Sequence, residues 1–231
     1  MSNAAELLYP RRCAICDGLL GKKELYVCTD CRDAVRFIRG PVCRKCGRPT
    51  EEGVLLCKTC AERRHAFEQS VSPYEYRDEM RRSVLRFKYS GRAEYAEFFA
   101  RSMAVYAAEK IRLWKPELIV PVPVHPARKR KRGYNQSALI ARILSSEWEL
   151  PFDEKLLIRR KRTKPQTELD RTERQKNVAK AFRCERSRSV PGTVLLIDDI
   201  LTTGSTLDAC AEELKKAGAE KVYALCLCVD E

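Results

Sequence analysis

The sequence predicts an α/β fold, in which a mainly parallel sheet carries helices on both faces, and a small zinc-binding domain that precedes it. Eight of the twelve cysteines fall before residue 61, as four Cys-x-x-Cys pairs, whereas the rest of the chain alternates strand and helix patterns. With 231 residues the chain has room for one α/β domain and a small second one. We predict a double zinc-ribbon domain over 1–66 and the α/β domain over 67–231.

The apolar run 194–197 predicts a buried central strand, and Asp198 and Asp199 follow at its carboxyl end. A turn of small residues comes next, and 207–217 continue as a helix whose positive end faces the turn. The turn suits a phosphate, and the paired acids suit the hydroxyls of a ribose. The turn consists of Thr202, Thr203, Gly204, Ser205 and Thr206. This stretch resembles the 5-phosphoribosyl-1-pyrophosphate (PRPP) motif of type I phosphoribosyltransferases; an acidic helix cap in any doubly wound protein is the alternative.

The cysteine pairs are spaced as in zinc ribbons. Eleven residues separate the first two pairs, ten separate the next two, and the unit repeats at an offset of about thirty. Four thiolates close a tetrahedral site, so the two predicted zinc ions are structural. Redox dithiols, disulfides and cross-braced pairing are the alternatives, and His65 is interpreted as a surface or linker residue. The predicted ligands are Cys13, Cys16, Cys28 and Cys31, then Cys43, Cys46, Cys57 and Cys60.

Charge and composition narrow the class of partner. The formal net charge of +13 favours polyanions, either phosphates or nucleic acid. No apolar run approaches the length of a membrane span and the amino terminus lacks a secretory pattern, so we expect a cytoplasmic protein. The cysteines outside the pairs are interpreted as small packing residues; they are Cys184, Cys210, Cys226 and Cys228.

Basic segments are expected around the acidic turn. The apolar run 118–123 predicts a second strand, and a cationic loop over 125–136 leads from it into a helix over 137–148. Since parallel strands end at a common edge, this loop is expected beside Asp198, where its charge suits a pyrophosphate. A nucleic-acid patch is the alternative. A third basic segment starts at Arg159 and predicts a mobile lid, or else a disordered connector.

Taken together, these motifs resemble the competence protein F (ComF) family over the whole chain. Besides the cysteine pairs and the PRPP motif, the resemblance rests on Lys88-Tyr89-x-Gly91, Val120-Pro121-Val122-Pro123, Arg132-Gly133-Tyr134-Asn135-Gln136, Gln166-Thr167 and Asn177-Val178. It implies a type I phosphoribosyltransferase fold. It also implies that Asp198 and Asp199 hold the ribose hydroxyls, directly or through Mg²⁺, and that the turn takes the 5-phosphate. The remaining PRPP-binding residues it implies are Lys88, His125, Arg128 and Arg132.

The resemblance implies a role in natural competence and DNA uptake. The first hypothesis is a PRPP-binding, phosphoribosyltransferase-like protein that handles incoming single-stranded DNA, with other competence proteins as partners. Catalysis would displace pyrophosphate from C1 of the ribose, and the sequence does not specify the acceptor. The second hypothesis is a non-catalytic nucleic-acid or protein adaptor with PRPP as a regulatory ligand. Nucleobase salvage is a weaker third, because the chain ends soon after the final strand pattern.

Overall fold

The protein was analysed as a computed structural model, which describes residues 10–33, 35–160, 181–185 and 187–230. The predicted lid lies mainly outside the described residues, as do Gln166-Thr167 and Asn177-Val178. Most elements expected from the sequence are present at close to the expected positions. The largest difference is the cationic loop, part of which is a helix.

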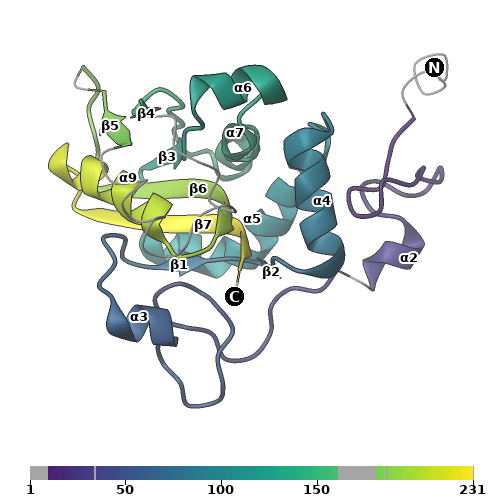
Figure 1. The fold of residues 1–231 in the computed structure, drawn as a ribbon, viewed down its shortest axis with the longest axis horizontal. Coiled ribbons are helices and arrows are strands. Elements are labelled where there is room, and N and C mark those ends of the chain that lie inside the picture. Colours follow the sequence, from purple (N-terminus) through teal and green to yellow (C-terminus); the bar gives the residue numbers. More distant parts are fainter. Residues whose placement is uncertain (1–9, 34, 161–180, 186, 231) are drawn as a thin grey trace.

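A parallel five-stranded sheet forms the centre of the molecule (Figure 1). The strand order is β1, β7, β6, β3. β2 lies on the same side of β7 as β1 and pairs with the carboxyl end of β7. A separate antiparallel hairpin, β4 with β5, flanks the segment 161–180 in sequence. The strands are β1 Ser70–Val71, β2 Tyr74–Glu75, β3 Leu118–Pro121, β4 Leu157–Arg159, β5 Phe182–Cys184, β6 Thr193–Leu201 and β7 Lys221–Val229.

Two helical layers cover the sheet, as the fold class requires. Helices α4, α5 and α7 share a hydrophobic core with one face, and α9 shares a second core with the other. The helices are α2 Thr29–Arg32, α3 Lys58–Glu62, α4 Asp78–Tyr89, α5 Tyr95–Trp114, α6 Pro126–Arg132, α7 Gln136–Trp148 and α9 Ser205–Lys216. None of the described helices is long and apolar enough to cross a bilayer.

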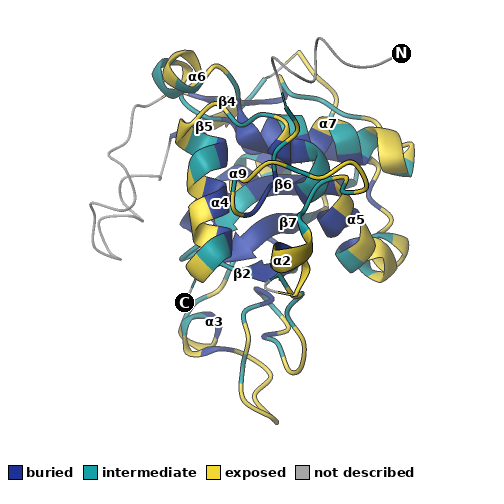
Figure 2. Cartoon of the chain, turned by 90° about the vertical axis from the view of Figure 1, so that its right-hand side faces the viewer, coloured by how far each residue is buried: buried dark blue, intermediate teal, exposed yellow. Residues whose placement is uncertain are grey.

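The central strand β6 divides its side chains between the two cores. Leu195 and Ile197 belong to the core beneath α5 and α7, whereas Val194 and Leu196 belong to the core beneath α9. All four are fully buried, which explains why the sequence shows a continuous apolar run instead of an alternating one. Figure 2 shows β6 and β7 as the dark blue interior of the domain.

The two cysteine-rich segments lie on opposite sides of this sheet. Cys13 and Cys31 join the core of α4, α5 and α7, whereas Cys43 and Cys57 join the core of α9. Figure 1 shows α2 beside α4 and α3 below the β1 edge. Each ribbon therefore packs on a different layer of the α/β domain. The boundary between 66 and 67 stays a prediction.

Candidate functional site

The paired acids lie where the sheet opens on one side. β3 pairs with β6 as far as Pro121 and Ile197, whereas β7 keeps pairing with β6 through Leu201. Asp198 and Asp199 thus follow directly after the β3 pairing ends, although the strand itself continues beyond them. The sequence had ended the strand at Ile197, because a double acid interrupts the apolar pattern. Pairing with β7 extends it.

The two carboxylates point to different elements. Oδ1 of Asp198 accepts hydrogen bonds from the Ser137 hydroxyl at 3.1 Å and from the Asp199 backbone N–H at 2.9 Å. Oδ1 of Asp199 lies 2.9 Å from Nζ of Lys88, near the end of α4, and each of these two side chains is only 14% exposed. The structure therefore brings Lys88, expected from the resemblance, directly to the acidic pair.

Asp198 is in an environment that disfavours its charge. Burial raises its pKa to about 7, and the neighbouring Asp199 carboxylate adds to the rise. The Asp199 N–H, the Lys88 ammonium and the Ser137 hydroxyl act in the opposite direction. A cation or a set of ligand hydroxyls beside this carboxyl would favour its ionised form.

Residues 202–206, here named the phosphate turn after the ligand expected from the sequence, connect β6 to α9. Gly204 is the residue before the helix and has a φ of 77°, a left-handed conformation that favours glycine. Oγ of Ser205 lies 2.8 Å from Oγ1 of Thr203, so hydroxyls gather at the amino end of a helix of 12 residues. Amino ends of helices carry partial positive charge and bind anions.

The cationic segment after β3 is a short helix, α6, where a loop was expected. His125 caps it, since its Nδ1 accepts the Ala127 N–H at 3.2 Å, and Pro126 occupies the first turn. Gly133 ends the helix in a left-handed conformation with φ of 86°. The dense charge of this segment obscured these capping signals. α6 follows β3 at the same sheet edge as the acidic pair, as predicted.

One basic residue of α6, Arg132, contacts the residue that follows Lys88. Nη2 of Arg132 donates to the Tyr89 hydroxyl at 3.0 Å, and its guanidinium lies 4.8 Å from the centre of that ring. Arg159 was expected only as the start of a basic segment, but it is buried at 8% exposure on β4. Burial lowers the pKa of Arg159, and so does the positive charge of Arg128, whereas Asp198 raises it. Arg159 on β4 therefore interacts electrostatically with Arg128 of α6 and with Asp198.

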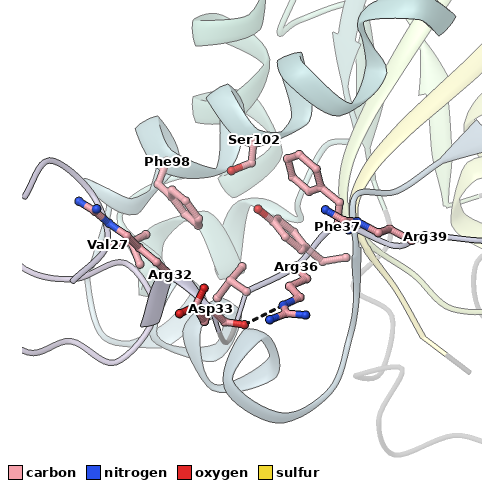
Figure 3. A pocket seen from close by; sticks show the side chains of 10 residues that line it. Val27, Arg32, Asp33, Arg36, Phe37, Arg39, Phe98 and Ser102 are labelled. Carbon is pink, nitrogen blue, oxygen red and sulfur yellow. Dashed lines mark hydrogen bonds between the residues drawn. The ribbon is translucent and has the colours of Figure 1, made fainter. Parts of the chain in front are cut away.

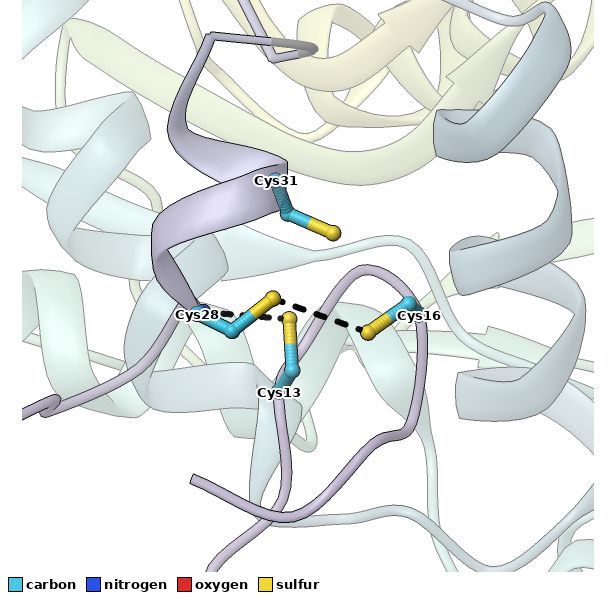
Figure 4. Close-up of side chains that lie close together, drawn as sticks. All are labelled: Cys13, Cys16, Cys28 and Cys31. Atoms are coloured by element: carbon cyan, nitrogen blue, oxygen red, sulfur yellow. Dashed lines mark hydrogen bonds between the residues drawn. The ribbon is translucent and has the colours of Figure 1, made fainter. Parts of the chain in front are cut away.

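The cysteines gather as two four-thiol groups, each from consecutive pairs, which confirms sequential pairing over the cross-braced alternative. Within each group the sulfur atoms all lie within 4.8 Å of one another. Figure 4 shows the first group, in which Sγ of Cys16 lies 3.8 Å from Sγ of Cys28; in the second, Cys46 and Cys57 are 3.7 Å apart. Tetrahedral zinc with Zn–S bonds of about 2.3 Å separates its sulfurs by about 3.8 Å.

The chemistry of both donor sets fits zinc. In the first group the thiol of Cys13 accepts the backbone N–H groups of Ile15 and Cys28, each at 3.4 Å. Burial opposes ionisation of Cys13, but N–H donors lower its pKa to about 7. A hydrogen bond from Cys60 lowers the pKa of Cys46 to about 5. All twelve cysteines are described and none forms a disulfide. The other four pack as expected: three are fully buried, and Cys184 is half-buried.

The sequence suggested that His65 is a surface or linker residue. It does lie in the connector between α3 and β1, but its side chain is not on the surface. Its side chain is 1% exposed, and its Nδ1 donates to Oδ2 of Asp208 at 3.0 Å. Asp208 lies 143 positions further along the chain, so no local pattern connects the two. Nothing in the spacing around His65 revealed this role; a lone histidine between a ribbon and a strand reads as linker.

Comparison with known proteins agrees with this architecture. A double zinc ribbon domain model matches residues 4–61, and a phosphoribosyl transferase domain model matches residues 134–231. Among solved structures, a purine phosphoribosyltransferase from Pyrococcus horikoshii matches with 21% identity and a TM-score of 0.38, over 57% of this chain and 74% of that chain. The two domain models, together with the parallel sheet and its helical layers, show that the protein combines a double zinc ribbon with a phosphoribosyltransferase fold.

The more specific relationship comes from full-length relatives. The chain is 31% identical over 226 residues to the DNA utilization protein YhgH of Salmonella typhimurium, covering 96% of this chain and 98% of that protein. It is 30% identical to competence protein F of Haemophilus influenzae over 91% of this chain and 93% of the relative. It is also 30% identical to competence protein ComFC of Bacillus subtilis, over 89% of each. The chain belongs to the competence protein F family.

Proposed function

We propose that this protein binds PRPP together with Mg²⁺ at the carboxyl edge of the sheet and handles single-stranded DNA during DNA uptake. The observation that carries the proposal is the convergence of Asp198, Asp199 and Lys88 at the start of the phosphate turn. An acid pair, an ammonium and a helix amino terminus are complementary to the diol and phosphates of one ligand. The names of the relatives, which refer to competence and DNA utilization, support the DNA role.

Each part of the site has a proposed task. Asp198 and Asp199 accept the ribose hydroxyls, and the turn from Thr202 to Thr206 holds the 5-phosphate. Lys88, His125, Arg128 and Arg132 are the proposed pyrophosphate contacts. Mg²⁺ prefers carboxylate and phosphate oxygens, so the acid pair fits it, and when bound it would neutralise charge on the diphosphate.

The chemistry that such a site supports is transfer of the phosphoribosyl group. The C1–O bond to pyrophosphate breaks with its electron pair leaving on the diphosphate, and an acceptor nucleophile forms the new bond to C1. The acids would position the ribose, and the cations would stabilise the negative charge that develops on the departing diphosphate. An assay for pyrophosphate release with nucleobases and single-stranded DNA as acceptors separates an enzyme from an adaptor that uses PRPP only as a ligand.

A cavity beside the first ribbon, referred to below as the groove, supports the DNA role. A cavity of about 530 Å³ lies between the first ribbon, the connector after α2, and helix α5. Figure 3 shows that arginines and aromatic rings line it together: Arg32, Arg36, Arg39, Phe37 and Phe98. The three arginines are exposed, whereas both rings are half-buried. Guanidinium groups bind phosphates and aromatic faces stack on bases, a combination that suits single strands because their bases are free to stack.

The groove is tested by fluorescence anisotropy with labelled oligothymidine and a matched duplex. We expect tighter binding of the single strand. Replacing Arg32 and Arg36 with glutamine should weaken binding and lower the slope of log affinity against log salt by about one to two. Arg112→Gln, at an exposed position near the far end of α5, is the matched control. Equal loss in the control, or preference for duplex, would contradict the proposed groove.

A further inference from the structure

The second zinc ribbon and the connector that follows it contact the phosphate turn and the start of α9. Nη2 of Arg48 donates to the backbone carbonyl of Thr202 at 2.9 Å. Arg48 lies within the ribbon, two residues after Cys46. The first residue of the phosphate turn is thereby fixed by a side chain that comes from 154 positions earlier in the chain.

The connector after the ribbon fixes the other end of the turn. Arg63 lies with Nη1 3.3 Å from Oγ of Ser205 and with Nη2 2.9 Å from Oδ2 of Asp208. Oδ1 of Asp208 accepts the backbone N–H of Ala66 at 2.8 Å, and His65 binds the same carboxylate. Asp208 is 4% exposed. One buried carboxylate in the first turn of α9 therefore collects three donors from the connector.

Close packing makes this contact specific. A Cβ at Gly204 would lie 2.8 Å from Cε1 of His65, so the histidine ring occupies the space beside the turn. That ring stacks on Phe67 with centres 4.8 Å apart, and Nζ of Lys45 lies 5.5 Å from the centre of the Phe67 ring. A continuous series of contacts thus leads from the second ribbon to the phosphate turn.

The ion pair between Arg63 and Asp208 also affects the charge beside the phosphate turn. The carboxylate of Asp208 stands in the first turn of the helix whose amino end would hold a phosphate, and by itself it would repel that anion. The guanidinium of Arg63 neutralises it at 2.9 Å. Loss of Arg63 would therefore both loosen the turn and place an uncompensated negative charge beside the ligand.

The first ribbon is fastened to a different part of the molecule. It contacts α4, where the Ile15 carbonyl accepts from Arg86 at 2.6 Å, and the segment between α4 and α5, where Asp17 is paired with Arg92 at 2.8 Å. The second ribbon is fastened to β1, where the Ser70 N–H donates to the Lys45 carbonyl at 2.8 Å. The two ribbons are thus distinguishable by what they touch.

We propose that the second zinc ribbon is the positioning element of the phosphate turn, so that zinc in the Cys43, Cys46, Cys57 and Cys60 site controls affinity for PRPP. Arg48, Arg63 and His65 are the positioning residues, and they contact the turn from behind. Zinc fits this role because a ribbon of this length lacks a core of its own and depends on its metal to fold. The inference rests on the proposed PRPP site and adds its regulation by zinc.

Two matched pairs of variants test it in the full-length, zinc-loaded protein. Arg63→Met is compared with Arg44→Met, which removes an exposed charge of the second ribbon. Cys57→Ser is compared with Cys28→Ser, which removes the corresponding ligand of the first ribbon. The measurements are zinc content, amide hydrogen exchange of 202–208 without ligand, and the Kd for PRPP. Arg63→Met and Cys57→Ser should each raise the Kd by about ten- to a hundredfold and speed exchange in the turn. The Arg44 and Cys28 variants should change neither measurement by more than about twofold.

Each outcome decides a separate question. If the exchange of 202–208 is unchanged in Arg63→Met and Cys57→Ser, or rises equally in both cysteine variants, the positioning role is wrong. If the wild-type protein does not bind PRPP, the proposed function fails, but the exchange measurement still decides whether the ribbon orders the turn. Zinc content distinguishes loss of one ion from collapse of both ribbons.

Discussion

Asp198→Asn is expected to stabilise the ligand-free protein in a pH-dependent manner. Burial and the Asp199 charge raise the pKa of Asp198 from an ordinary value of 3.8 to about 7. Between these values the native state keeps a proton that the unfolded chain has released, so the free energy of unfolding falls as pH rises through this window. Above it the ionised carboxylate costs about 4 kcal/mol relative to an unshifted group.

An asparagine removes this titration and keeps an oxygen that can accept from Ser137 and from the Asp199 N–H. Its amide must find partners of its own, which costs about 1–3 kcal/mol at any pH. The quantity to measure is therefore how the difference in unfolding free energy between variant and wild type changes with pH. The stability of the variant relative to wild type should increase by about 2–3 kcal/mol between pH 5 and pH 8.

Urea unfolding at several pH values, with zinc present throughout, measures this difference. Glu109→Gln, which neutralises an exposed carboxylate on α5, is the control and should show a change below about 0.5 kcal/mol over the same range. A variant whose ΔΔG is independent of pH would refute the raised pKa. The more stable variant should also lose affinity for PRPP, a combination typical of a functional residue.

Three further predictions follow from neighbouring contacts. Gly204→Ala should lower the free energy of unfolding by about 2–4 kcal/mol, because the added methyl group meets His65. Gly133→Ala, at a similar φ but with no atom near the added methyl group, should lower it by about 1 kcal/mol, and urea unfolding compares the two variants. Lys88→Met should weaken PRPP binding about tenfold in a calorimetric titration, since Asp199 loses its cation, whereas Lys22→Met at an exposed ribbon position should not. Native mass spectrometry should find two zinc ions in wild type and one in Cys57→Ser; two in the variant would contradict the ligand assignment.

Local patterns in the sequence were sufficient for the centre of the fold. The apolar run before Asp198 and the small-residue turn after Asp199 predicted β6, the turn and α9 in order, because strand burial and helix capping are local effects. Cysteine spacing predicted both ribbons, and the structure confirms sequential pairing. The assignment of PRPP, Mg²⁺ and the individual site residues stays a prediction.

Contacts between distant segments were beyond the reach of these patterns. His65 reads as a linker residue because its partner Asp208 lies 143 positions further along the chain. Arg159 reads as one of many basic residues because its burial depends on how β4 packs. The helix α6 was missed for a different reason: its caps, His125 and Gly133, lie around a run of charge that resembles a loop. For His65 and Arg159, tertiary packing supplied information that spacing does not contain.

The central claim is that the edge of the sheet at Asp198 and Asp199 is a PRPP site. Calorimetric titration of the zinc-loaded protein with PRPP and Mg²⁺, beside the Asp198→Asn/Asp199→Asn double variant, tests it most directly. We predict saturable binding by wild type and a loss of at least about a hundredfold in the double variant. Absence of binding by a folded wild type that retains both zinc ions would contradict the claim, and so would equal binding by the variant.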